Sequence, residues 1–218
     1  MKLVSKQQQQ AMQEAEPPLH IILASQSIGR RSLLEKLGIR FRVVVSRVDE
    51  DSIQDKDPHK MIKKRAAAKA AEVAKNPRVY MLDESAKNLI IAADSMAIVG
   101  KKTYGKAKDR EHAKVILKDL MGKAHTFTTA VTVYYLEGHA IKKVWDKSHH
   151  TKVHLRKLSP AEVDSYVSRF DFTRFAAGYA LNETPWDLVV KVDGSFTNVI
   201  GLPFEVILPI LRQVKAIV

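Results

Sequence analysis

The feature that most constrains the fold is a pair of long segments in which apolar and polar residues alternate. Residues 125–138 read HTFTTAVTVYYLEG, and residues 139–158 read HAIKKVWDKSHHTKVHLRKL. Alternation with a period of two is typical of strands with one buried face. Two such runs that meet at Glu137 and Gly138 predict a long antiparallel hairpin, and a hairpin of this length needs a sheet around it.

Short β-rich runs alternate with helical patterns in the rest of the chain. Strands are predicted at residues 20–24, 41–46, 88–94 and 188–194, and helices at residues 28–37, 58–76, 110–121, 160–169 and from 203 onward. Residues 195–201, SFTNVIG, are expected to form a loop. The alternation predicts an α/β fold whose mixed sheet is flanked by helices.

The N-terminal segment differs in composition from the rest of the chain. Residues 1–18 contain a glutamine run, Gln7 to Gln10, and end in Pro17-Pro18, which predicts a disordered tail. No internal repeat and no clear linker follow, so residues 19–218 are expected to form a single domain.

Composition narrows the classes of partner. Lys and Arg number 36 against 24 for Asp and Glu, a net charge of +12 that suits polyanions such as nucleotides or nucleic acid. The absence of Cys excludes a disulfide framework, a thiol nucleophile and a zinc–thiolate site. No apolar stretch approaches the ~20 residues that cross a bilayer, and no targeting segment is evident, so we expect a cytoplasmic protein without a membrane partner.

Two arginines stand at the start of the first predicted helix, in SQSIGRRSLLEKLG. Helix N-termini favour anions, and Ser25 and Ser27 add hydroxyl groups, so Arg30 and Arg31 suit a bound phosphate. The alternative begins the helix at Ser32, with Glu35 completing a capping box, and leaves the arginines as ordinary loop charges. The sequence leaves both interpretations open.

A lysine falls on the apolar stripe of the second predicted helix. Ile62, Ala66, Lys69 and Val73 share one face by their spacing. A buried lysine requires an anion, whereas the alternative is a packed stem with a solvated ammonium group.

Two carboxylates are candidates for metal and water binding. Asp94 is expected at the carboxyl end of a buried strand, where α/β proteins bind ligands, and Glu50 lies in an acidic turn between Asp49 and Asp51. The alternatives are a turn-forming Asp94 and a solvated turn. The lysine-rich loop at residues 100–109, which includes Lys106, could neutralise a polyphosphate or be a solvated loop.

The order of these motifs resembles the Maf (septum-formation inhibitor) family. The resemblance rests on LASQSIGRRSLLEKLG, VDE, AAAKA, IAADSMAIVGKKTYGKAKDREHAKVILKDLMGKAHTFTTAVTV, AAGYAL and DGSFTNVIGLPFEVI. It implies an ITPase-like (Maf/Ham1) fold with two lobes around a central cleft. It also implies a nucleoside triphosphate pyrophosphatase that releases nucleoside monophosphate and pyrophosphate with a divalent cation, Mg²⁺ or Mn²⁺.

The resemblance assigns roles to the residues singled out above. It implies catalytic roles for Asp94, Glu50 and Lys69, with the cation held by Glu50 and Asp94. The expected phosphate-binding residues are Ser25, Ser27, Arg30, Arg31 and Lys106, and the expected base-side residue is Asn182. The expected partner is then a nucleoside triphosphate substrate. A homodimer is compatible with the sequence.

The chain also departs from the family pattern. Ser27-Ile28-Gly29-Arg30 replaces the usual Ser-Pro-Arg-Arg, and Ala107 replaces a proline. Asp94-Ser95 is closer to the Asp-Thr of the dTTP/UTP branch than to the Asp-Gln of the 7-methyl-GTP branch, which favours pyrimidine nucleotides. The departures also suggest an alternative function, a catalytically impaired Maf-like protein that binds nucleic acid or regulates cell division.

Overall fold

A computed structural model describes residues 16–179, 181 and 186–218. One seven-stranded mixed sheet runs through the molecule in the order β2-β1-β3-β5-β6-β7, with β4 paired to β3 outside this path. The strands are β1 (Leu19–Ala24), β2 (Arg42–Val44), β3 (Lys87–Val99), β4 (Lys102–Tyr104), β5 (Ala124–Glu137), β6 (Ala140–Leu155) and β7 (Val189–Asp193). The predicted α/β fold with a mixed sheet is therefore confirmed.

The long hairpin is present as predicted. Strands β5 and β6 pair antiparallel from Glu137↔Ala140 to Ala124↔His154, with an irregularity in register at Tyr135 and Leu136. Strand β5 also pairs antiparallel with β3, whereas β1 lies parallel to both β2 and β3. The hairpin thus adds an antiparallel half to a parallel half.

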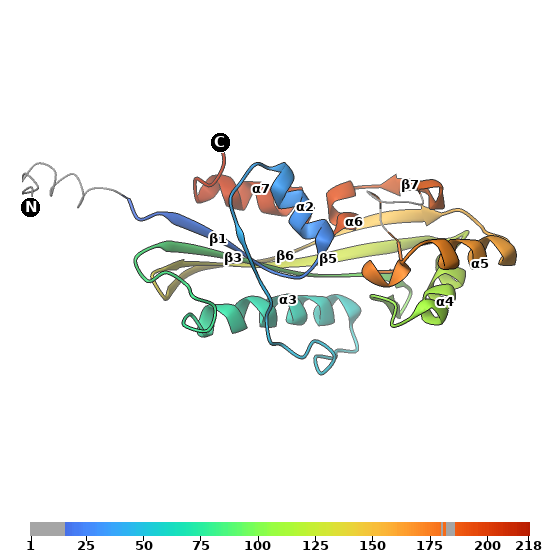
Figure 1. Ribbon diagram of the computed structural model, residues 1–218, viewed down its shortest axis with the longest axis horizontal. Helices are drawn as coiled ribbons and strands as arrows, with labels where there is room; N and C mark the ends of the chain where they lie inside the picture. Colours follow the sequence, from blue (N-terminus) through green and yellow to red (C-terminus); the bar gives the residue numbers. More distant parts are fainter. Residues whose placement is uncertain (1–15, 180, 182–185) are drawn as a thin grey trace, which may run out of the picture.

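Helices cover both faces of the sheet (Figure 1). Helix α3 lies on one face, and α2, α6 and α7 lie on the other, while α4 and α5 cluster at one end. The helices are α2 (Ile28–Lys36), α3 (Pro58–Lys75), α4 (Arg110–Leu120), α5 (Pro160–Arg169), α6 (Phe196–Ile200) and α7 (Phe204–Gln213), with 3₁₀ turns η1 (Phe172–Arg174) and η2 (Trp186–Leu188).

Helix boundaries follow their capping residues. Asp57 caps α3 by accepting a hydrogen bond from the His59 N–H, and Pro58 occupies the first turn. Ser159 and Glu162 form the predicted capping box of α5. The expected loop at residues 195–201 is wrong in part, because Ser195 caps the short helix α6 and Gly201 ends it with a left-handed backbone, φ 115°.

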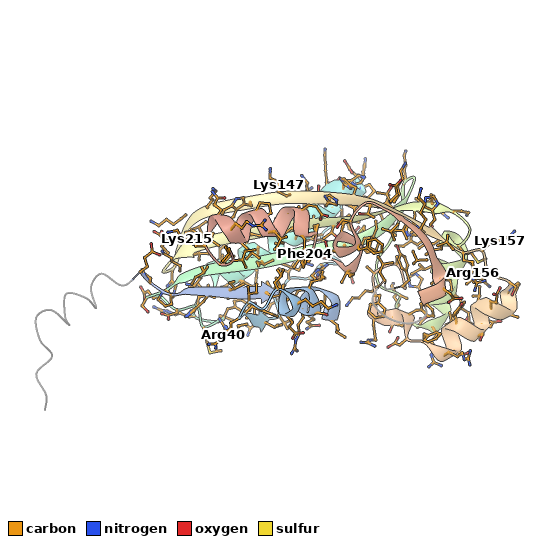
Figure 2. The ribbon with its side chains drawn as sticks, turned by 90° about the horizontal axis from the view of Figure 1, so that it is seen from above. Arg40, Lys147, Arg156, Lys157, Phe204 and Lys215 are labelled. Carbon is orange, nitrogen blue, oxygen red and sulfur yellow. The ribbon has the colours of Figure 1, made fainter. Side chains whose placement is uncertain are left out.

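Four apolar clusters pack the helices against the sheet. One packs α4 and α5 against β5 and β6, and includes Leu120, Phe127 and Val163. A second packs α2 and α7 against the sheet and includes Leu34 and Ile207, and the remaining two pack α3 against it. Figure 2 shows the elongated outline, with Arg40 and Lys215 toward one end and Arg156 and Lys157 at the other.

The predicted N-terminal tail lies largely outside the described residues. The described part, residues 16–18, has no regular secondary structure. The Pro18 carbonyl accepts a hydrogen bond from the Lys87 N–H at 2.9 Å, and Lys87 Nζ lies 3.3 Å from Glu16 Oε2. Within the described ranges, no helix is both long and apolar enough to cross a membrane.

Candidate active site

The loop between β1 and α2 brings two serine hydroxyls to the start of the helix. Ser27 is the N-cap of α2, and its Oγ accepts a hydrogen bond from the Arg30 backbone N–H at 3.4 Å. The Ser27 backbone N–H donates to Ser25 Oγ at 3.2 Å. The helix therefore begins directly after the loop, and the alternative start at Ser32 is wrong. Its N-terminal N–H groups form the kind of end that attracts anions.

Arg30 is a buried cation that ties three segments together. Its Nε donates to the Gly201 carbonyl at 2.8 Å, and its two Nη groups donate to Ser25 Oγ and Ser95 Oγ, each at 2.9 Å. Burial lowers the pKa of Arg30, while the negative charges of Asp94 and Glu50 oppose that shift. The guanidinium is thus fixed between the helix start and strand β3 before any ligand arrives.

Arg31 does not join this group. Its Nε donates to Glu35 Oε1 at 2.7 Å, an i,i+4 ion pair on the exposed face of α2. Its side chain is 63% exposed. The structure therefore separates the two arginines that the sequence placed together, and Arg31 is not part of the cavity wall described below.

Lys69 links the two candidate carboxylates. It lies on the buried stripe of α3 with Ile62, Ala66 and Val73, as predicted, and is only 5% exposed. Its Nζ lies 2.8 Å from Glu50 Oε2 and 3.1 Å from Asp94 Oδ1. The alternative of a solvated ammonium group is wrong, because the buried charge is paired with both carboxylates.

Asp94 keeps one carboxylate oxygen unengaged. Its Oδ2 is buried and has no hydrogen-bond partner among the described residues. The expected position at the carboxyl end of a strand is wrong, because β3 continues to Val99 through its pairing with β4 and β5. The parallel neighbour β1 ends at Ala24, however, so Asp94 lies just beyond the end of that strand.

Glu50 comes from the acidic loop after β2. The Asp49 side chain shapes this loop by accepting hydrogen bonds from the backbone N–H groups of Asp51 and Ser52, at 3.2 and 3.4 Å. Glu50 is 41% exposed at its side chain, much more than Asp94 at 13%. Glu50 therefore contacts Lys69 from the solvent side, and Asp94 contacts it from the sheet.

Lys106 reaches the site from the second half of the molecule. The residue forms an isolated β-bridge with Ala176, and the Ala177 N–H donates to the Gly105 carbonyl at 2.8 Å. Burial lowers the pKa of Lys106, and the nearby charge of Arg30 lowers it further. Lys106 and Ala176 both line the cavity described below.

Seven of the predicted residues line one cavity of about 710 Å³. Its wall contains Ser25, Ser27, Arg30, Glu50, Lys69, Asp94 and Lys106. An aromatic wall of Phe127, Phe175 and Tyr179 also lines this cavity. Asn182, the expected base-side residue, lies outside the described residues.

Tyr179 is fixed in that wall by a buried histidine. The Tyr179 hydroxyl lies 2.7 Å from His125 Nε2, and both side chains are buried. Burial lowers the pKa of His125 to about 4, so the imidazole is neutral at pH 7. This pair was not recognised from sequence, because buried histidines and tyrosines give no spacing pattern across 54 residues.

A close contact with Ile200 explains why glycine stands at position 29, where the family usually has arginine. A Cβ atom at this position would lie 2.7 Å from the Ile200 carbonyl oxygen and 3.0 Å from Ile200 Cγ2. Helices α2 and α6 therefore approach so closely that no side chain fits without a shift. The carbonyl of the next residue, Gly201, is the one that binds Arg30.

The chain matches known proteins over most of its length. The family model described as "Maf-like protein" matches residues 20–214. A protein named dTTP/UTP pyrophosphatase from Thermoanaerobacter sp. (strain X514) is 35% identical over 89% of this chain and 96% of its own. One of the same name from Pyrococcus furiosus is 36% identical over 88% and 94%, respectively.

The similarity to solved structures is weaker. The nucleoside-triphosphatase, dITP/XTP pyrophosphatase, from Mycobacterium abscessus covers 89% of this chain and 97% of its own, at 13% identity and a TM-score of 0.41. The sequence matches are much stronger and extend over nearly all described elements. The chain belongs to the Maf-like protein family.

Proposed function

We propose that this protein is a nucleoside triphosphate pyrophosphatase. The reaction cleaves the bond between the α-phosphorus and the oxygen that bridges it to the β-phosphorus. Water supplies the oxygen that remains on the nucleoside monophosphate, and the displaced group leaves as pyrophosphate. The single observation that carries the proposal is Lys69, buried in the cavity wall and paired with both Glu50 and Asp94.

The carboxylates suit a hard divalent cation, Mg²⁺ or Mn²⁺. Asp94 Oδ2 is buried without a partner among the described residues, and Glu50 is partly exposed to the cavity. No cluster of three potential metal-ligand side chains occurs in the described part of the chain. Mg²⁺ commonly takes one or two carboxylates and completes its coordination with substrate phosphates and water, so Glu50 and Asp94 fit this role. The bound cation would withdraw charge from the phosphate oxygens.

The protein side chains would orient the attacking water, bind the phosphates and stabilise the developing charge. We assign to Asp94 the orientation of the attacking water, because its carboxylate lies in the cavity wall and its side chain is 13% exposed. Arg30, Lys69 and Lys106 would stabilise the negative charge that develops on the leaving pyrophosphate. Ser25 and Ser27, at the N-terminus of α2, would contribute donors to the phosphates.

Pyrimidine triphosphates are the substrates that we propose first, with modified nucleotides as the other class. The names of the relatives, dTTP/UTP pyrophosphatase, support this choice. So does Asp94-Ser95, which is closer to the Asp-Thr of the dTTP/UTP branch than to the Asp-Gln of the 7-methyl-GTP branch. A panel of dTTP, UTP, the common purine triphosphates and their deaminated and methylated forms tests the assignment. We expect pyrophosphate release to be fastest with dTTP or UTP, and release of single phosphate instead would refute the proposed bond cleavage.

The alternative of an impaired, nucleic-acid-binding protein receives less support. A site without turnover has no need to keep a buried lysine between two carboxylates. The positions that differ from the family pattern, Ile28 and Gly29, lie beside this arrangement and leave its contacts intact.

A further inference from the structure

The cavity carries more positive charge than the proposed mechanism uses. Its described wall contains six basic and three acidic side chains, namely Arg30, Arg65, Lys69, Lys106, Lys108 and Arg174 against Glu50, Asp51 and Asp94. Lys69 is already paired with Glu50 and Asp94. The positive charge available to a polyphosphate must therefore come from basic residues other than Lys69. Arg65 is one of these, and the proposed mechanism gives it no role.

Arg65 lies on the helix face that points to the site. Met61, Arg65 and Lys69 follow one another at intervals of four residues on α3, and all three line the cavity. Residues at this spacing are neighbours on a helix surface, about 6 Å apart along its axis. The Arg65 side chain therefore begins one helical turn from Lys69.

The guanidinium of Arg65 is only partly engaged. Its Nε donates to the Ile53 carbonyl at 3.2 Å, which ties the loop that carries Glu50 to α3. Neither Nη group has a hydrogen bond or ion pair with any residue in the described ranges. Arg30 differs in this respect, because each of its guanidinium nitrogens already has a protein partner.

We propose that Arg65 is a substrate-binding residue that donates through its Nη groups to phosphate oxygens at the pyrophosphate end of the nucleotide. The inference rests on the proposed function. A guanidinium presents paired donors that match two phosphate oxygens, so it suits this end of the substrate. The neighbours of Arg65 agree, because Lys69 and the Glu50 loop lie beside it. The aromatic wall of Phe127, Phe175 and Tyr179, which suits a base, comes from β5 and from the segment after η1 instead of α3.

The test compares the binding of the two reaction products, pyrophosphate and the nucleoside monophosphate. Inorganic pyrophosphate and dTMP are titrated calorimetrically, each with Mg²⁺, into the wild-type protein and into R65Q, R65K and the control K75Q. Glutamine keeps an N–H donor for the Ile53 carbonyl but removes the charge. Lys75 is an exposed lysine in the last turn of the same helix, outside the cavity wall. We expect R65Q to bind pyrophosphate about tenfold more weakly, a loss of ~1.4 kcal/mol, with dTMP affinity changed less than about twofold.

The variants also separate binding from loop support. R65K keeps the charge and loses the paired donors, so its pyrophosphate affinity should fall between those of the wild-type protein and R65Q. K75Q should bind both ligands as the wild-type protein does. Equal weakening of pyrophosphate and dTMP in R65Q and R65K would overturn the inference, because it would indicate a displaced loop.

The outcome for the wild-type protein distinguishes the two proposals. If it releases pyrophosphate from triphosphates and both Arg65 variants bind pyrophosphate normally, only the inference about Arg65 is wrong. If the wild-type protein neither binds pyrophosphate nor hydrolyses any triphosphate, the proposed function is wrong and the inference falls with it.

Discussion

The contact between Gly29 and Ile200 leads to a prediction about both stability and activity. In the substitution Gly29→Ala, the new methyl group would lie 2.7 Å from the Ile200 carbonyl oxygen and 3.0 Å from Ile200 Cγ2. The first of these atoms is backbone and cannot rotate away. Helices α2 and α6 must therefore separate for the methyl group to fit.

Two opposing effects set the size of the change. Alanine in place of glycine inside a helix gains at most about 1 kcal/mol, and less in the first turn, where Gly29 lies. Overpacking against a rigid neighbour costs about 1–3 kcal/mol. We therefore expect the free energy of unfolding to fall by about 1–2 kcal/mol, the reverse of the usual result for this substitution in a helix.

The same movement should reach the active site. The residue that follows Ile200 is Gly201, whose carbonyl accepts the 2.8 Å hydrogen bond from Arg30 Nε. A displaced carbonyl lengthens this bond and shifts the guanidinium that we assign to the phosphates. Since small misplacements of binding groups are costly in catalysis, we expect kcat/KM to fall about tenfold. Gly29→Arg, which restores the usual family residue, should lower activity further rather than improve it.

Urea unfolding and pyrophosphate release measure the two effects. Ser32→Ala is the matched control, because it lies in the same helix, is absent from the cavity wall and gains only helix propensity. Wild-type stability and activity in Gly29→Ala would show that the α2–α6 contact tolerates a methyl group, as would a rise in stability equal to that of the control.

Two further predictions concern pH. The His125 pKa of about 4 lies below the ordinary value of 6.5, so below pH 6.5 the unfolded chain binds a proton that the folded protein does not, and stability falls with the pH. Between pH 7 and pH 5 this histidine should lower the free energy of unfolding by about 2 kcal/mol. In urea unfolding of His125→Gln, the change in stability between these pH values should be smaller by the same amount. An unchanged pH dependence would contradict the lowered pKa of His125. Because the pKa of Lys106 is lowered, the wild-type KM should begin to rise at a lower pH than an ordinary lysine, with a pKa of 10.5, would cause, and Lys106→Arg should suppress the rise. A rise that persists in Lys106→Arg would assign the effect to another group.

Features with local causes could be predicted from the sequence. The β5–β6 hairpin follows from alternation, and the starts of α3 and α5 follow from Asp57 and Ser159 next to proline. Lys69 was recognised because helical periodicity placed it on an apolar face. Each of these signals acts over a few residues, so the sequence alone contains it.

Features with distant causes could not be predicted. Strand β3 continues past Asp94 because β5, more than 30 residues away, pairs with it. Arg30 and Arg31 look alike in sequence, but only Arg30 meets Gly201, a partner 171 residues away. Likewise the need for glycine at position 29 arises from Ile200 on another helix.

The most direct test of the account is pyrophosphate release by Asp94→Asn with dTTP or UTP and Mg²⁺. Asparagine keeps the shape of the side chain but removes the carboxylate that we assign to the water and the cation. An exposed aspartate on β6, replaced in Asp146→Asn, serves as the control. We expect a loss of about 10²–10⁴-fold in kcat for Asp94→Asn, with a folded protein and with normal turnover in the control. Turnover by folded Asp94→Asn within a few-fold of the wild-type rate would contradict this expectation.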